Sequence, residues 1–540
     1  MRTKTLILFL GVASLCSAQL KISADSRYLT EQDDSPVFLV AEGIWDINNI
    51  TLTQARVLFD SMQSHHLNMG IVRMMSPAAF GGPGNAYGIR PWQGTQTFAS
   101  NPNDAFWLHL DTLASEAASR GIYLQFFPAY LGGDATQGWQ IEVGNSTAAQ
   151  MKTFGRYIGN QFRDNPNIIW GIAGDYPPTS YQTKLDSLVA GIKASGDTHL
   201  MSTRDEQGTT TDTYWRGRSW VDIGGTYPYW NSYSAELIYR DGYGFYNRIP
   251  LKPAGGQEFW YEHEHNTTTQ HQLIQQTYYP ILSGLLAYVA FGNCPVWNYG
   301  FSSYGFPECG AVTWYNDLNS QGHKNMKFYA ELFSPRHWWL LVPDTLQACA
   351  DSGYGTFGNQ TYCTTAFASD STFLVTYMPT PHNIRIKLSY IKGDSVTCAW
   401  YNPTTGITTS IGRKPTTRTT FTAPSADIVF IAEMLQGPTG VVPRLDRPAK
   451  ADLLQNYPNP FNPQTTIRYD VAVATQVIVT VYNILGQRIR TLVNALQMPG
   501  SFSVVWDGRN DAGVAAGSGL YVCQLAAGSE TYKTKIVLMR

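Results

Sequence analysis

Two acidic residues follow predicted strands and could act together in catalysis. Asp175 ends the segment 167–175, Asn-Ile-Ile-Trp-Gly-Ile-Ala-Gly-Asp, and Glu258 ends the segment 252–258, Lys-Pro-Ala-Gly-Gly-Gln-Glu. If both segments are strands of one β/α barrel, their carboxylates meet on the face where the carboxyl ends of the strands converge. Two carboxyl groups that face each other in this way are what glycoside hydrolysis requires. The pair predicts a carbohydrate-cleaving enzyme.

The elements that would position this pair form a repeating series. Apolar runs of strand length recur from Val37 to about Ala290, separated by segments with helical periodicity, which is typical of parallel βα units. Asp175 would follow the fourth strand and Glu258 would end the seventh. We therefore predict an α/β fold, a (β/α)8 TIM barrel over residues 19–350. The expected strands are 37–42, 69–74, 122–127, 168–174, 199–203, 221–225, 252–258 and 288–297.

Helices are expected between these strands. Residues 53–65 follow the cap residue Thr51 or Thr53, residues 104–120 end before Gly121, and residues 148–162 end before Pro166. A doubly wound open sheet is the alternative architecture. Such a sheet usually has a glycine-rich phosphate turn after its first strand, and residues 41–45, Ala-Glu-Gly-Ile-Trp, are not one.

Other strand ends carry candidate substrate contacts. Glu42, Trp45, Arg73 and Trp297 lie at such positions, although for Arg73 an ion pair with a neighbouring carboxylate is an equally good interpretation. Glu262 competes with Glu258, because residues four apart share one face of a strand if the strand continues. Glu258 lies nearer the barrel strand, so we assign catalysis to Glu258 and substrate hydrogen bonding to Glu262.

Other kinds of chemistry have weaker support. Residues 262–265, Glu-His-Glu-His, resemble a metal cluster, but without a helix the two histidines lack the spacing of a zinc protease and a solvated loop is favoured. Asp205 and Glu206 are interpreted as loop charges. No Gly-x-Ser-x-Gly elbow accompanies a strand-to-helix turn of the barrel. We expect neither a metal nor a cofactor.

Composition and cysteine usage fit an exported protein. Charged residues are 14% and aromatic residues 13%, with a net charge of -2, which leaves no basic face for nucleic acid and many rings to stack on sugars. Of the 7 cysteines, Cys16 lies in the N-terminal leader. We expect the local pairs Cys294–Cys309 and Cys349–Cys363, with Cys398 and Cys523 free.

The N-terminus has the pattern of a signal peptide. Arg2 and Lys4 precede the apolar run 6–15, and Cys16-Ser17-Ala18 supply the small residues of a cleavage site. The apolar run is too short to remain as a membrane span, and we expect no transmembrane segment elsewhere. Residues 1–18 are therefore predicted to be removed and the mature protein to be secreted or displayed on the cell surface.

Two β modules are expected after the barrel. Residues 373–434 consist of short alternating strands with turn sequences, which indicates a small β-sandwich over 351–435. Residues 436–452 begin Gln-Gly-Pro-Thr-Gly and form a predicted linker. A second, immunoglobulin-like β-sandwich is expected over 453–540.

The barrel resembles the apiosidase-like glycoside hydrolases. The similarity covers roughly residues 20–435. It lies in residues 37–45, 167–175, 258–262 (Glu-Phe-Trp-Tyr-Glu), 333–344 and 399–406. It implies that Asp175 is the general acid/base and Glu258 the nucleophile of a retaining mechanism, with Tyr261 and Glu262 beside the substrate. It also implies polysaccharide side chains as substrate, with apiosyl linkages of pectin as the first candidate. Specificity can have drifted, because Glu42 replaces the usual Asp, Tyr176 a frequent Arg and Phe259 a proline.

The two β modules resemble known domains as well. The first is similar to a module named for collagen binding, and we rank structural support of the barrel above collagen or glycan binding. The second resembles a type A sorting domain of the type IX secretion system in residues 456–463, 482–487, 506–510 and 518–521, turns that also occur in immunoglobulin-like modules of flagellar hook-capping proteins. It implies the type IX secretion machinery as a partner. The competing interpretation of the whole chain is a surface adhesin with an idle barrel.

Overall fold

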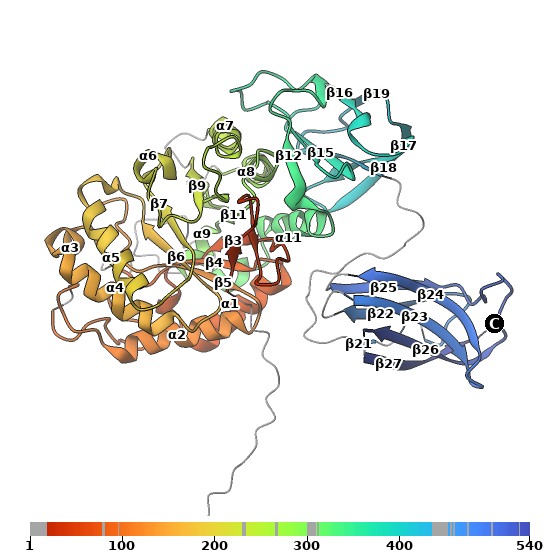
Figure 1. Cartoon of the computed structure of the whole chain (residues 1–540), viewed down its shortest axis with the longest axis horizontal. Coiled ribbons are helices and arrows are strands. Elements are labelled where there is room, and N and C mark those ends of the chain that lie inside the picture. The colour runs from red at the N-terminus through yellow and green to blue at the C-terminus, as the bar shows by residue number, and fades with distance from the viewer. Residues whose placement is uncertain are drawn as a thin grey trace, which may run out of the picture. The chain divides into compact units, whose positions relative to one another are not determined.

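Eight short parallel strands form a closed barrel in the described residues of the computed structural model (Figure 1). The structure describes residues 19–77, 82–95, 97–228, 234–264, 268–299, 309, 313–434, 452–453, 456, 459–471, 475–497, 500–528 and 530–539. A bridge between Ser202 and Ile223 closes the ring. The strands are β3 (Val40–Gly43), β4 (Met69–Arg73), β5 (Tyr123–Phe127), β6 (Ile168–Ala173), β7 (Met201–Arg204), β9 (Gly224–Tyr227), β10 (Ala254–Gly256) and β11 (Val289–Phe291).

Helices surround the barrel on its outside (Figure 1). Three of those described begin with a capping box made by a threonine and a glutamine, which satisfy each other's backbone N–H groups: Thr51 with Gln54, Thr147 with Gln150, and Thr269 with Gln272. The helices are α1 (Leu52–Ser64), α2 (Asp104–Ala118), α3 (Gln140–Asn145), α4 (Ala148–Phe162), α5 (Gln182–Ala194), α6 (Thr211–Trp215), α7 (Ala235–Tyr246), α8 (Gln270–Leu282), α9 (Cys294–Asn298), α10 (Trp314–Asp317) and α11 (Gln321–Phe333).

The barrel interior is filled by every second residue of its strands. Ala41, Ile71, Phe127 and Ile169 belong to one buried cluster inside the ring. Their neighbours along each strand point outward to the helices, because side chains alternate along a strand. This alternation decides which strand-end residues can reach the barrel mouth.

The predicted fold class is confirmed, but several strands are shorter than expected: the seventh, predicted at 252–258, spans Ala254–Gly256, so Glu258 lies just beyond it. The strand predicted at 288–297 ends at Phe291, because the Asn293 side chain accepts a hydrogen bond from the Val296 N–H and begins α9. Trp297 therefore lies on a helix. Cys294 and Cys309 form the expected disulfide.

The first sandwich packs against the barrel. It begins at Leu341, before the predicted start at 351, because β12 already pairs with β14. One sheet has the order β12-β14-β15-β20-β17-β18 and the other β13-β16-β19. The strands are β12 (Leu341–Pro343), β13 (Ala350–Ser352), β14 (Thr364–Ala368), β15 (Phe373–Met378), β16 (Asn383–Lys387), β17 (Ser395–Asn402), β18 (Ile407–Pro415), β19 (Arg418–Thr422) and β20 (Ile428–Met434).

The expected bridge between Cys349 and Cys363 is wrong. Both thiols are buried and free. Cys349 precedes β13 and Cys363 precedes β14, and these strands belong to different sheets of the sandwich. Cys398 and Cys523 are also free, as expected.

Hydrogen bonds join the barrel helices to the first sandwich. The Tyr279 hydroxyl on α8 donates to the carbonyls of Gln360 and Tyr362, at 2.9 and 3.0 Å. The Tyr239 hydroxyl on α7 donates to the Asn359 carbonyl at 2.9 Å. These phenols lose their partners if the sandwich is removed, so the two parts form one structural unit.

The C-terminal module is a separate compact unit. Its sheets have the orders β21-β22-β25 and β24-β23-β26-β27. The strands are β21 (Asp452–Leu453), β22 (Thr465–Val471), β23 (Thr475–Asn483), β24 (Arg488–Gln497), β25 (Gly500–Trp506), β26 (Gly519–Ala527) and β27 (Glu530–Leu538). Most of the predicted linker and the predicted signal peptide lie outside the described residues. Within the described residues, no helix has both the length and the apolar character to cross a membrane.

We predict that the two β modules respond differently to truncation. Deleting residues 453–540 should leave the thermal unfolding midpoint of the remaining protein within about 2 °C, because the module has its own core. Deleting from residue 351 onward should give insoluble protein, because it uncovers α7 and α8. Scanning calorimetry and the soluble fraction after expression measure both. A soluble protein with an unchanged midpoint after the longer deletion would show that the first sandwich is independent.

Candidate active site

One arginine holds the two strand-end carboxylates together. Arg204 ends β7, and its Nε donates to Asp175 Oδ1 at 3.1 Å. The same guanidinium forms an ion pair through Nη2 with Glu258 Oε2. Asp175 follows the fourth barrel strand, β6, and Glu258 follows the seventh, β10. The structure therefore brings together the two residues that the sequence singled out, on either side of a cation.

The chain leaves β6 through an unusual backbone turn. Ala173, Gly174 and Asp175 all have positive φ, at 72°, 128° and 50°. A side chain on Gly174 would meet the Tyr130 ring at 2.3 Å, so glycine is required there. Aspartate adopts the left-handed region more readily than most residues. Strain of this kind gathers at functional sites, and here it directs the Asp175 carboxylate to Arg204.

Aromatic side chains enclose the charged group. The Arg204 guanidinium lies over the rings of Trp45 and Tyr227, at 4.4 and 4.6 Å from their centroids. The Trp45 Nε1 donates to the Tyr261 hydroxyl at 2.6 Å. The Tyr130 hydroxyl donates to Asp175 Oδ2. Rings and phenols at a barrel mouth suit contact with the faces and hydroxyls of a sugar.

The charges in this cluster support one another. Burial alone would lower the pKa of Arg204, but the negative charge of Asp175 and the nearby phenols raise it above its ordinary value. Burial and the charge of Asp175 also raise the pKa values of Tyr130 and Tyr227 well above their ordinary range. The guanidinium therefore stays charged and the phenols stay protonated as hydrogen-bond donors.

Exposure differs between the two carboxylates. The Asp175 side chain is 22% exposed and that of Glu258 is 9% exposed, while Arg204 is 2% exposed. A molecule entering from solvent therefore reaches Asp175 more easily. Such asymmetry suits one group that exchanges protons with solvent and one that is shielded from it.

Two further predicted contacts lie near the cluster. Trp297 on α9 meets the Tyr261 ring edge to face, with centroids 6.4 Å apart. Arg73 ends β4, and its Nε donates to Asp46 Oδ1 at 2.8 Å. The ion-pair interpretation of Arg73 thus describes what the structure shows, although its guanidinium also lies 5.5 Å from the Tyr130 ring centroid.

Glu42 lies outside the barrel mouth. It alternates with Ala41, which points into the barrel, so its side chain points to the helix layer. There Glu42 Oε1 is 2.9 Å from His323 Nε2 of α11, and Glu42 has no exposed surface. The structure does not bring Glu42 to the carboxylate pair, and we do not include it in the proposed site.

Glu262 caps a helix in the structure. Its Oε1 accepts from the Gly322 N–H at 2.8 Å, and its Oε2 accepts from Asn293 Nδ2 at 3.1 Å and from Ser320 Oγ. The donors of Gly322 and Ser320 belong to the first turn of α11, where a carboxylate is favoured by the helix dipole. With both oxygens engaged and only 4% of the residue exposed, Glu262 is not placed to bind substrate.

One group among the described residues has the composition of a metal site. The ligand atoms of Glu262, His263 and Asp317 lie within 4.8 Å of one another. Asn293 Nδ2 donates to both carboxylates, and His263 Nε2 lies 3.3 Å from Asp317 Oδ2. These hydrogen bonds account for the cluster without an ion. The solvated-loop interpretation of this segment is wrong for Glu262 and Glu264, which are 4% and 5% exposed.

Sequence reasoning missed the cation and a buried acid beside it. The signal that could have found Arg204 is a charged residue directly after the strand predicted at 199–203, and the structure extends that strand, β7, to Arg204 itself. Asp205 was interpreted as a loop charge, which is wrong. It is 1% exposed, its Oδ1 accepts from Trp215 Nε1 at 2.6 Å, and burial raises its pKa to about 8.

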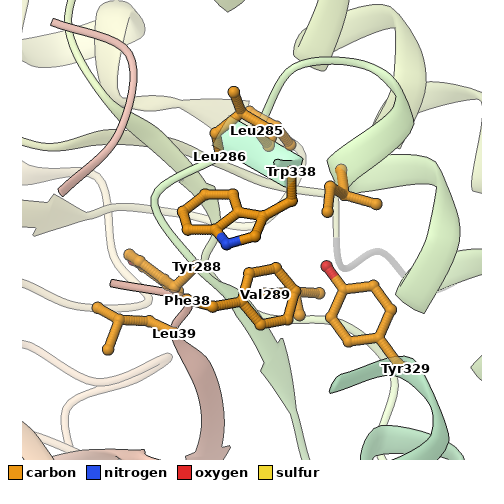
Figure 2. A pocket seen from close by; sticks show the side chains of 9 residues that line it. Phe38, Leu39, Leu285, Leu286, Tyr288, Val289, Tyr329 and Trp338 are labelled. Carbon is orange, nitrogen blue, oxygen red and sulfur yellow. The ribbon is translucent and has the colours of Figure 1, made fainter. Parts of the chain in front are cut away.

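A small cavity lies elsewhere, between the barrel and its helices. It has a volume of about 10 Å³, room for about one water molecule. Figure 2 shows Trp338 and Tyr329 facing it from the helix side and Phe38 and Val289 from the strand side. Its size excludes a sugar, so it is a packing defect and not a substrate site.

Comparison with known proteins identifies the family. A family model described as "Apiosidase-like, catalytic domain" matches residues 23–340, more than half of the chain. The chain belongs to the apiosidase-like family. Its barrel is the catalytic domain of that family, and the prediction of a glycoside hydrolase is confirmed. Models described as "Putative collagen-binding domain of a collagenase" and "FlgD Ig-like domain" match residues 354–433 and 464–530.

Solved structures share the fold of this apiosidase-like chain. One described as a glycoside hydrolase is 20% identical with a TM-score of 0.67, and the match covers 78% of this chain and 98% of the other. A glycoside hydrolase family 5 protein from Bacteroides vulgatus is 23% identical with a TM-score of 0.68, covering 78% and 94%. At these identities the likeness concerns the fold alone. No curated protein matches the sequence.

We predict that Asp205 makes stability depend on pH. Its pKa of about 8 in the folded state is above the ordinary aspartate value of 3.8, so the folded protein keeps this proton when the unfolded chain has lost it, and stability falls as pH rises from about 4 to about 8. Asp205→Asn cannot ionise and keeps the acceptor for Trp215. Relative to the parent, the variant should therefore gain about 2 °C or more in melting temperature between pH 3.5, where Asp205 is protonated in both states, and pH 9. An equal difference at both pH values would contradict the burial of a neutral acid.

We predict a structural role for Glu262. Glu262→Gln places an amide N–H against donors, which should cost about 1–3 kcal/mol of stability. KM for a cleaved glycoside should stay within about twofold, because the side chain does not face the cluster. Glu331→Gln on the surface of α11 is the matched control. An unchanged melting temperature with a raised KM would return Glu262 to the substrate-binding site.

Proposed function

We propose that this apiosidase-like protein is an exported, retaining glycoside hydrolase that removes sugars from polysaccharide side chains. The observation that carries the proposal is that Asp175 and Glu258, from the ends of the fourth and seventh strands, meet on one guanidinium. Asp175 acts as general acid/base and Glu258 as nucleophile. Trp45, Tyr261 and Trp297 line the sugar site, and Arg73 supports it through Tyr130.

The chemistry proceeds in two steps. Asp175 donates a proton to the leaving oxygen while Glu258 attacks the anomeric carbon, which forms a glycosyl ester on Glu258 and breaks the glycosidic bond. Asp175, now ionised, takes a proton from water, and that water displaces Glu258 to release the sugar. The greater exposure of Asp175 supports its role as the group that exchanges a proton with water.

The contacts of Arg204 support retention over inversion. Retaining enzymes hold their carboxyl groups about 5–5.5 Å apart, whereas inverting enzymes separate them by about 6.5–9.5 Å to admit water. The shared contact with Arg204 supports the shorter separation, because it draws both carboxyl groups to one guanidinium. Direct attack by Glu258 is then favoured over activation of an intervening water.

Apiosyl linkages in pectic polysaccharides are the first substrate to test. This choice rests on the family, while the departures at Glu42, Tyr176 and Phe259 leave room for another sugar. A panel of aryl glycosides and pectic oligosaccharides, read by released product, tests it. Release of product from apiosyl substrates supports apiosyl linkages as the substrate. Release of product from another glycoside assigns the specificity to that sugar instead.

The C-terminal module is proposed to direct export. Its match to an immunoglobulin-like domain agrees with the sorting-domain resemblance in fold. The match does not test a sorting function. We propose that it engages the type IX secretion machinery and that the enzyme is secreted or held at the cell surface. In a host with that pathway, deleting residues 453–540 should abolish export while leaving turnover of the purified enzyme unchanged.

The first sandwich is proposed to support the barrel. Its hydrogen bonds to Tyr239 and Tyr279 favour this role over collagen or glycan binding. An adhesin with an idle barrel is the competing function. Binding to the oligosaccharide panel without turnover would favour it.

We predict that both proposed catalytic residues are indispensable. Asp175→Asn should lower kcat about 10²–10⁴-fold, and Glu258→Gln at least as much, because each removes one role in the same reaction. Initial rates on a cleaved aryl glycoside measure both effects, with circular dichroism to check folding. Glu264→Gln, an acid of the same loop, serves as the control.

Azide separates the two roles. A smaller nucleophile variant, Glu258→Gly, should regain activity in azide and give a glycosyl azide of inverted configuration, whereas Asp175→Gly should give one of retained configuration. The reverse pattern would exchange the two assignments. Near-normal activity of Glu258→Gln would contradict the site itself.

A further inference from the structure

Arg204 is the cation that contacts both proposed catalytic carboxylates. It comes from a different strand than either of them, at the end of β7 between β6 and β9 in the barrel. Nε faces Asp175 and Nη2 faces Glu258, so the two acids contact different nitrogens of one planar group. A guanidinium suits this arrangement because its donors point in fixed directions.

The guanidinium is held in place from both faces. Trp45 after β3 and Tyr227 at the end of β9 cover it, and neither ring can shift easily, since Trp45 is 5% exposed and Tyr227 is 2% exposed. The inward face of β7 also carries Ser202, to which Gln125 Nε2 donates at 2.6 Å. Arg204 therefore offers its donors from a fixed position.

Two carboxylates that contact the same guanidinium would repel each other if its positive charge were absent. Two acids that share a site without a cation hold one proton between them, and one of their pKa values rises strongly. A double displacement needs a different balance, in which one group is ionised and the other gains and loses a proton within the working pH range. The groups that face Arg204 and set this balance are Asp175, Glu258, Tyr130, Tyr227, Tyr261 and Tyr288, with Arg73 acting on Asp175 from β4.

We propose that Arg204 is a positioning residue that fixes the separation of Asp175 and Glu258 and sets the pH range in which the pair works. The inference rests on the proposed function. Arg204 lies against both acids, and a positive charge at that position favours the ionised form of a carboxyl group. Removing the positive charge of Arg204 shifts both limbs of the pH profile to higher pH. Replacing the guanidinium by another cation disturbs the placement of the two acids but shifts the limbs little.

The first test is the pH dependence of kcat/KM on a glycoside that the parent enzyme cleaves. Arg204→Gln should lose about 10²-fold or more in kcat and move both limbs upward by about one pH unit or more. Arg204→Lys keeps the positive charge but not the forked donors of the guanidinium. Its kcat should therefore fall, while the limbs of its pH profile shift less than those of Arg204→Gln. Arg248→Gln, which breaks the ion pair with Asp212 away from the site, is the control and should change neither limb.

A loss of kcat with unmoved limbs in Arg204→Gln would overturn the proposal and leave Arg204 a purely structural residue. If Arg204→Gln fails to fold, Arg204→Lys decides. Near-parental kcat in that variant would overturn the positioning role, and a lowered kcat with limbs close to the parent's would support it.

The second test does not depend on turnover. Arg204→Gln should melt well below the parent at pH 7, where two neighbouring carboxylates lack a counter-charge, and the deficit should shrink at pH 4.5. Adding Glu258→Gln to Arg204→Gln should restore part of the melting temperature at pH 7, because one of the two repelling charges is gone. A deficit that is equal at both pH values and is not relieved by Glu258→Gln overturns the inference.

The two tests keep the inference apart from the proposed function. If the parent cleaves no glycoside in the panel, the proposed function fails. The melting temperatures of the parent, of Arg204→Gln and of the double variant with Glu258→Gln still decide whether Arg204 holds the two acids together.

Discussion

Two carboxylate groups can lie side by side inside a barrel mouth only if a positive charge offsets their repulsion and their lost hydration. Arg204 supplies that charge, with Nε of its guanidinium on Asp175 and Nη2 on Glu258. The surrounding rings of Trp45 and Tyr227 keep the cation from solvent and from other conformations. The positions of the three strand ends, the turn after β6 and the aromatic enclosure all serve this one contact.

The alternation of side chains along each strand decides which acids take part. Ala41 and Gly43 face the barrel interior, so Glu42 between them faces α11 and pairs with His323. Glu262 lies beyond β10 and finds its donors at the first turn of α11. Both acids strengthen the attachment of α11 to the barrel, and neither reaches the cluster around Arg204. An acid at a strand end is thus a poor guide to function until the face it occupies is known.

The sequence predicted the barrel well because each βα unit is a local pattern. Apolar runs, threonine N-caps and glycines at helix ends can each be recognised within a few residues. Together they predict the eight strands and the helices between them. Contacts between units are not local, and there the sequence failed. The charge of Arg204 acquires meaning only when β6, β7 and β10 converge, and Asp205 was interpreted as exposed because the loop that buries it against Trp215 cannot be inferred from composition. The cysteine pair failed for the same reason, since Cys349 and Cys363 are near in sequence but enter different sheets.

The central claim is that Glu258 is the group that becomes bonded to the sugar. A fluorinated analogue of a cleaved glycoside, with a good leaving group, slows the second step and leaves the covalent ester in place. Peptide mapping of the inactivated enzyme by mass spectrometry then locates the label. The account predicts a label on Glu258, with stoichiometric loss of activity. A label on Glu262 or Asp175, or inactivation without any covalent label, would contradict it.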